Sequence, residues 1–173
     1  MRNVAVFGRV VLGGYLAAHG AQKLFGVLGG SGLDATAAGF ERLGLTPSRE
    51  MAMLAGAGEL GGGILTATGI ADPLGPVTIA ASMTVATAVH RKNGPFSANG
   101  GYELPLTNLA LATALVASGP GVIRLGPRLP RPLATAVIVG AIAMTAVPLV
   151  KLLTYQAPPA PTAVEPDQPA GGA

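Results

Sequence analysis

Five long apolar segments, separated by short breaks rich in glycine, proline or charge, dominate the sequence. Most of them approach the ~20 residues that an α-helix needs to cross the hydrocarbon core of a bilayer. The segments are residues 4–24, 49–70, 74–91, 103–118 and 133–153. The sequence therefore predicts an all-α, polytopic membrane protein, in which a four-helix bundle is followed by a fifth, C-terminal transmembrane helix.

The composition supports a membrane domain and excludes several classes of function. Only 11% of the residues are charged, whereas a soluble domain usually has about 25%. The 26 glycines and the 4% of aromatic residues suit closely packed membrane helices. The net charge of +3 is scattered along the chain, so a nucleic-acid surface is not expected. Because cysteine is absent, disulfides, thiolate nucleophiles, iron–sulfur clusters and cysteine-ligated zinc are excluded.

The segments between the helices define the expected domain organisation. Residues 1–118 form the four-helix membrane domain, in which residues 26–50 are an interfacial connector with a short amphipathic stretch near residues 37–43. Residues 119–132 form a loop rich in proline and arginine, residues 133–153 are the fifth transmembrane helix, and residues 154–173 are an Ala/Pro-rich tail expected to be disordered.

Several residues in these segments are predicted to shape the helix ends. Asp34 is expected to cap the short amphipathic stretch, and Thr46 to cap the second long helix with Pro47 as its first residue. Pro148 should kink the fifth helix. The three arginines of the loop, Arg124, Arg128 and Arg131, are expected at the level of the phosphate headgroups.

The first apolar segment is also compatible with a signal peptide. Arg2 supplies the charged start that such peptides have. However, Arg9 interrupts the apolar region, and Lys23 lies where small residues should precede a cleavage site. Retention as a first transmembrane helix is therefore the favoured interpretation.

Polar residues recur at one end of the expected bundle. The run HGAQKLFG at residues 19–26 closes the first helix and places His19 and Lys23 four residues apart, on one helical face. Alternating helix directions bring the end of the first and third helices to the same membrane face as the start of the second and fourth. The candidate residues for ligand binding or proton exchange at this end are His19, Gln22, Lys23, Glu59, His90, Asn99, Glu103 and Asn108.

Glu59 is the most informative member of this set because it lies well inside an apolar helix. A carboxylate at that depth either pairs with a cation, such as Lys23 or His19, or remains protonated. Such a pair has two interpretations, a functional site or a buried ion pair that only sets the register of the helices. Ionisable residues inside a membrane favour the functional interpretation.

Other chemistries find less support in the sequence. His19 and His90 invite a bis-histidine haem interpretation, but a haem pocket would need more aromatic lining. No His-x-x-His or Glu-x-x-His spacing is present, so no metal site is predicted. His90 is equally well explained as an interfacial residue beside Arg91 and Lys92. The glycines of residues 58–63 lie inside an apolar helix and lack the preceding strand of a nucleotide-binding loop.

Three motifs give the chain a family resemblance. They are HGAQKLFG at residues 19–26, GELGG at residues 58–62 and NGGYE at residues 99–103. With these motifs the chain resembles the DoxX family of small bacterial membrane proteins over about residues 4–118. The resemblance implies a four-helix bundle in the bacterial cytoplasmic (inner) membrane, and a link to thiosulfate or quinone redox metabolism and oxidative-stress complexes. The fifth hydrophobic run and the tail depart from the family pattern.

Two classes of function follow from these observations. In the first, the protein is a membrane redox subunit whose polar residues bind a quinone or a small sulfur oxyanion, while redox partner proteins or a bound cofactor supply electrons. In the second, it is a non-enzymatic scaffold or a small-molecule transporter, and either class is compatible with a homo-oligomer. The ligand site is expected under residues 34–43, and the opposite end, at Asp72 and Arg124, is expected to be closed.

Overall fold

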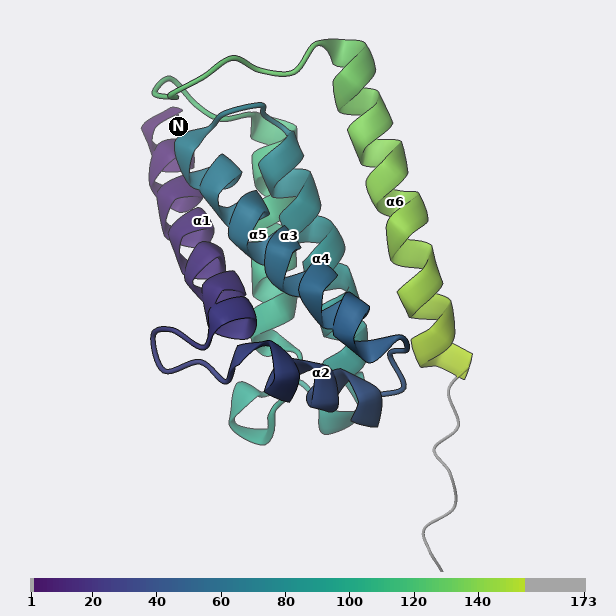
Figure 1. Cartoon of the computed structure of the whole chain (residues 1–173). Coiled ribbons are helices and arrows are strands. Elements are labelled where there is room, and N and C mark those ends of the chain that lie inside the picture. Colours follow the sequence, from purple (N-terminus) through teal and green to yellow (C-terminus); the bar gives the residue numbers. More distant parts are fainter. Residues whose placement is uncertain (1, 155–173) are drawn as a thin grey trace, which may run out of the picture.

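The structure, a computed structural model, describes residues 2–154, and this part of the chain is helical with no β-strand (Figure 1). The predicted tail falls almost wholly on residues 155–173, which lie outside the described residues. The helices are α1 (Arg2–Phe25), α2 (Gly32–Arg42), α3 (Ser48–Thr68), α4 (Leu74–His90), α5 (Glu103–Ser118) and α6 (Arg131–Thr154), with the short 3₁₀ helices η1 (Arg91–Asn93) and η2 (Ser97–Asn99) between α4 and α5.

Helices α1, α3, α4 and α5 form a bundle, and α2 lies across one of its ends (Figure 1). Helix α6 stands along the side of the bundle and packs against α4. The buried core lies between α1, α4 and α5, because each contributes an apolar stripe there. Its members are Leu12, Leu16, Ile79, Met83, Ala112 and Leu115. All-helical architecture is confirmed, and α5 has the predicted bounds.

Glycines let α1 and α3 approach until their backbones touch. Gly13 and Gly20 lie on α1, and Gly63 and Gly56 face them in antiparallel order on α3. A Cβ atom built on Gly13 would lie 2.5 Å from the carbonyl oxygen of Gly63, closer than real Cβ contacts. Any larger residue would separate the helices, so this seam fixes the distance between them.

Two predicted helix caps are wrong. Ser31 is the N-cap of α2, and Asp34 lies within the first turn of that helix. There its charge is favourable beside the helix N-terminus, and it pairs with Arg49 of α3. The N-cap of α3 is Pro47, one residue later than the predicted Thr46, and no side chain caps either helix.

A loop closes the end of the bundle opposite to α2. Residues 119–130 lie against the hairpin between α3 and α4, where the N–H of Leu125 donates to the carbonyl of Thr68 (3.0 Å) and that of Ala71 to the carbonyl of Pro127 (2.9 Å). Arg9 of α1, only 4% exposed, donates to two carbonyls of this loop. Arg128 was predicted to lie at the level of the lipid headgroups. Its side chain also forms an ion pair with Asp72, with 3.2 Å between Nε and Oδ2.

Burial raises the pKa of the Asp72 carboxyl, and the positive charge of its partner Arg128 opposes that rise. The end of the bundle is thus held together by a buried carboxylate and the arginines around it. This cluster binds the 119–130 loop to α1 and to the α3–α4 hairpin.

Two helices are long and apolar enough to cross a membrane by length and composition, residues Val4–Phe25 and α6, and α5 is a shorter apolar helix. Helix α4 has 17 residues, and α3 carries charged residues at its start and Glu59 inside. Helix α6 continues through Pro148 as one helix, and none of its most apolar window is buried. Five spans therefore stay a prediction.

If all five long helices span, the two termini lie on opposite membrane faces. Reporter fusions at the N-terminus and after Tyr155 should then give opposite signals, because the apolar length of α6 matches a bilayer core. A fusion in the 119–130 loop serves as the internal control and should report the same face as the N-terminus. Finding both termini on one face would make α6 an interfacial helix instead.

Candidate functional site

The centre of the candidate site is an ion pair between α1 and α3. The ammonium of Lys23 lies in hydrogen-bonding contact with Oε1 of Glu59. Glu59 is 3% exposed, whereas the side chain of Lys23 keeps 31% of its exposure. Of the two cations proposed as partners of Glu59, the structure pairs it with Lys23.

The second carboxylate oxygen of Glu59 has an unusual environment. Oε2 is buried and has no hydrogen-bond partner within residues 2–154. A buried carboxylate oxygen normally has a partner, because an unsatisfied one loses its hydration without compensation. The site therefore has one unsatisfied acceptor beside a lysine ammonium.

His19 and Gln22 lie on the same helix as Lys23 but make other contacts. The ring of His19 is half-buried and meets Tyr15 edge to face, with 4.6 Å between the ring centroids. The amide of Gln22 donates to the carbonyl of Leu28 at 3.0 Å and so stabilises the turn after α1. His19 thus adds an aromatic wall, and Gln22 is structural in this conformation.

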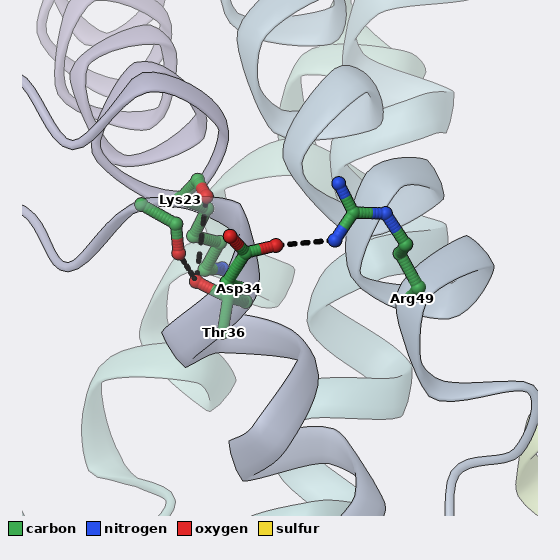
Figure 2. A network of polar contacts seen from close by, with 5 residues as sticks. Lys23, Asp34, Thr36 and Arg49 are labelled. Carbon is green, nitrogen blue, oxygen red and sulfur yellow. Dashed lines mark hydrogen bonds and ion pairs between the residues drawn. The ribbon is translucent and has the colours of Figure 1, made fainter.

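Helix α2 covers the end of the bundle next to the ion pair, and Figure 2 shows how it is held. The hydroxyl of Thr36 donates to the carbonyl of Gly32 at 2.7 Å and lies 3.4 Å from the carbonyl of Lys23. On the other side, Asp34 pairs with Arg49 of α3, and both side chains are exposed. Exposed ion pairs contribute little stability, so the packing of α2 against α3 and α1, with Ala37 buried, is the main attachment of the cover.

Of the remaining predicted residues, His90, Asn99 and Glu103 lie in or directly beside the connection between α4 and α5. Nδ1 of His90 lies 2.8 Å from the carbonyl oxygen of Gly100, to which Asn93 also donates at 3.0 Å. Glu103 accepts hydrogen bonds from the N–H and the hydroxyl of Ser97, at 2.9 and 2.6 Å. Asn99 is exposed in η2, and Asn108 is half-buried on α5.

Glu103 lies at the predicted end of the bundle, but its hydrogen bonds are to Ser97 and not to the Lys23–Glu59 pair. Glu103 is the first residue of α5, and two donors from Ser97 in the preceding loop hold it there. His90 is likewise occupied by the local turn rather than by the ion pair. Sequence order placed all these residues at one end of the bundle, but local hydrogen bonds divide them into two groups.

The sequence predicted a ligand site at this end under residues 34–43, but the cavity found there has none of those residues in its lining. It has a volume of about 550 Å³ and lies between the end of α4, the start of α5 and the end of α6. The sequence signal was weak, because the cavity depends on where α6 packs. Across residues 2–154, no three His, Asp or Glu side chains converge in a way that could hold a metal ion.

Comparison with known proteins agrees with the motifs. The DoxX family model matches residues 4–91, from α1 to the residue after α4, and this range includes both Lys23 and Glu59. No curated protein and no solved structure matches the chain. The match covers half of the 173 residues and identifies a membrane protein family. This chain belongs to the DoxX family.

Proposed function

We propose that this protein is a membrane subunit of a quinone- or sulfur-linked redox system of the bacterial cytoplasmic membrane, and that Lys23 and Glu59 bind its small-molecule ligand. The observation that carries the proposal is the buried Oε2 of Glu59, which has no partner in the described chain, next to Lys23, whose side chain is 31% exposed. An intramembrane ionisable pair with an unsatisfied acceptor is a functional site by default.

The two groups suit the chemistry of a quinone or of a small oxyanion. The Lys23 ammonium can donate to a quinone carbonyl or attract an oxyanion, and Oε2 of Glu59 can accept a hydrogen bond from a hydroxyl or take its proton. Because the chain contains no cysteine, electrons must come from a redox partner protein or from a bound cofactor. The protein's own part is to bind, to orient and to exchange a proton.

Access to the pair would come from the side of α2. Lys23 is the more exposed member of the pair, and the carbonyl of the same residue contacts Thr36 in the covering helix. The only ion pair described between α2 and α3 is the exposed one of Asp34 with Arg49. A movement of α2 away from α1 and α3 would uncover the side of the site on which Lys23 is partly exposed.

Photo-crosslinking with a quinone analogue tests this proposal. The analogue should label residues near Lys23 and Glu59, and Lys23→Ala should reduce labelling about tenfold, the loss expected for one charge-assisted hydrogen bond. The matched control is Lys92→Ala, which removes an exposed lysine at the same end of the bundle and should leave labelling unchanged.

Two other outcomes would contradict the proposal. Labelling confined to the α3–α4 hairpin near Asp72 would place the ligand at the opposite end. A colourless, quinone-free preparation that is not labelled, and in which thiosulfate has no effect, would favour a membrane scaffold or a small transporter that uses the same ion pair.

A further inference from the structure

The cavity between α4, α5 and α6 is a shallow groove that is open to its surroundings. Its volume of about 550 Å³ lies inside the range of roughly 300–1,000 Å³ that is usual for small-molecule pockets. Arg91 directly follows α4, and Thr84 lies seven residues earlier, so the cavity extends ~10 Å along the helix. Its lining residues are Thr84, Thr87, Ala88, Arg91, Tyr102, Leu109 and Leu149.

The walls of the cavity are apolar in effect. Leu109, Leu149 and Ala88 present hydrocarbon. The hydroxyls of Thr84 and Thr87 already donate hydrogen bonds within α4, to the carbonyls four residues earlier, at 2.8 and 2.7 Å. The part of the cavity away from Arg91 therefore offers few donors to a polar ligand and suits a hydrocarbon chain.

The mouth of the cavity carries a positive charge. Arg91 donates only to neutral carbonyl oxygens, that of Ala88 at 3.2 Å and that of Leu152 at 3.4 Å. Within residues 2–154 no carboxylate forms an ion pair with it. Lys92, which is exposed, adds a second cation beside it. A cation at a helix end, above an apolar groove, lies at the level where membrane phosphates are found.

The position of α6 explains why the groove opens sideways. Helix α6 packs against α4 and has no comparable contact with α5. The most apolar window of α6 has no buried residue, so lipid is its expected surrounding. A lipid chain can therefore reach the groove laterally, between α5 and α6, without crossing a polar surface.

From these features we propose that the groove between α4, α5 and α6 binds one anionic phospholipid, with its phosphate at Arg91 and an acyl chain along Thr84, Leu109 and Leu149. The charge of the mouth selects the anionic headgroup, and the apolar walls select the hydrocarbon chain. Bound there, the lipid fills the space between α5 and α6 and fastens the outer helix to the bundle. The site uses none of the residues of the Lys23–Glu59 pair.

Native mass spectrometry of the full chain in neutral detergent tests the site. The wild type should retain one molecule of added phosphatidylglycerol, and it should retain phosphatidylcholine less strongly. Arg91→Gln should reduce phosphatidylglycerol retention about five- to tenfold, as expected for the loss of one basic contact at the membrane surface. Ala88→Leu, which narrows the groove and keeps Arg91, should also reduce retention.

The control is Arg42→Gln, which removes an exposed arginine at the same end of the bundle and outside the groove. It should leave retention within about twofold of the wild type. Equal retention of the two lipids, or an equal loss in Arg42→Gln and Arg91→Gln, would overturn the site. Displacement of the phospholipid by a quinone analogue at Arg91 would show that the groove has a different occupant. Because Lys23 and Glu59 are intact in every variant, these results do not depend on the proposed function.

Discussion

Glu59→Ala should lower the free energy of unfolding by about 3 kcal/mol, near the lower end of the roughly 3–5 kcal/mol that follows from breaking a buried ion pair. The substitution leaves the ammonium of Lys23 without its partner. The cost stays near the lower end because the Lys23 side chain is 31% exposed and can reach water. Glu59→Gln should cost less, since the amide keeps the shape and can still accept a hydrogen bond from Lys23.

The free energy of unfolding is measured by titrating the protein from a mild detergent into a denaturing one. The matched control is Asp34→Ala, which breaks the other lysine- or arginine-carboxylate pair at this end, where both side chains are exposed. That change should have little effect, because solvent screens an exposed pair. Negligible and equal losses for Glu59→Ala and Glu59→Gln would mean that Glu59 faces water or headgroups.

Gly13→Ala should destabilise the protein by about 1–3 kcal/mol or more, the usual cost of overpacking. The new methyl group would lie 2.5 Å from the Gly63 carbonyl oxygen and 2.5 Å from the backbone N of Ala67. Both atoms belong to the backbone of α3, which cannot rotate away as a side chain can. The two helices must separate, and the Lys23–Glu59 pair between the same helices would be disturbed with them.

Gly14→Ala is the matched control, on the same helix and one residue later. A Cβ atom there has no neighbour within 4 Å, so the substitution should stabilise α1 by about 0.4–1 kcal/mol, as Gly→Ala does where the backbone permits it. A loss of stability in Gly13→Ala together with a gain in Gly14→Ala would identify the close contact between α1 and α3. A stabilising effect at both positions would contradict the close approach of α1 and α3.

Much of the fold follows from local sequence signals. The apolar run of α5 between its polar first residue and Gly119 gives both ends of the helix. Sequence reasoning also limited the partner of Glu59 to Lys23 or His19, and the structure selects Lys23. Lys23 near the end of α1 and Glu59 inside α3 reach the same level when the helices run in opposite directions.

The parts that were missed depend on contacts between distant segments. Arg9 donates to carbonyls 111 and 114 residues later, and nothing near Arg9 in the sequence points to them. Asp72 is held by Arg128 only because the 119–130 loop folds over the α3–α4 hairpin. Glu103 begins α5 as predicted, but sequence position did not indicate its local hydrogen bonds from Ser97.

The residues that contact α1 are synthesised later than α1 itself. Helix α1 leaves the ribosome first, but the partner of Lys23 follows it by 36 residues, and the carbonyls that bind Arg9 follow by 111 and 114. If α1 spans the bilayer as predicted, Arg9 and Lys23 are until then without these partners, and lipid must cover them and the glycine face. In that case the insertion of α1 would be completed by helices made after it, and the translocation machinery would have to hold α1 until α3 arrives.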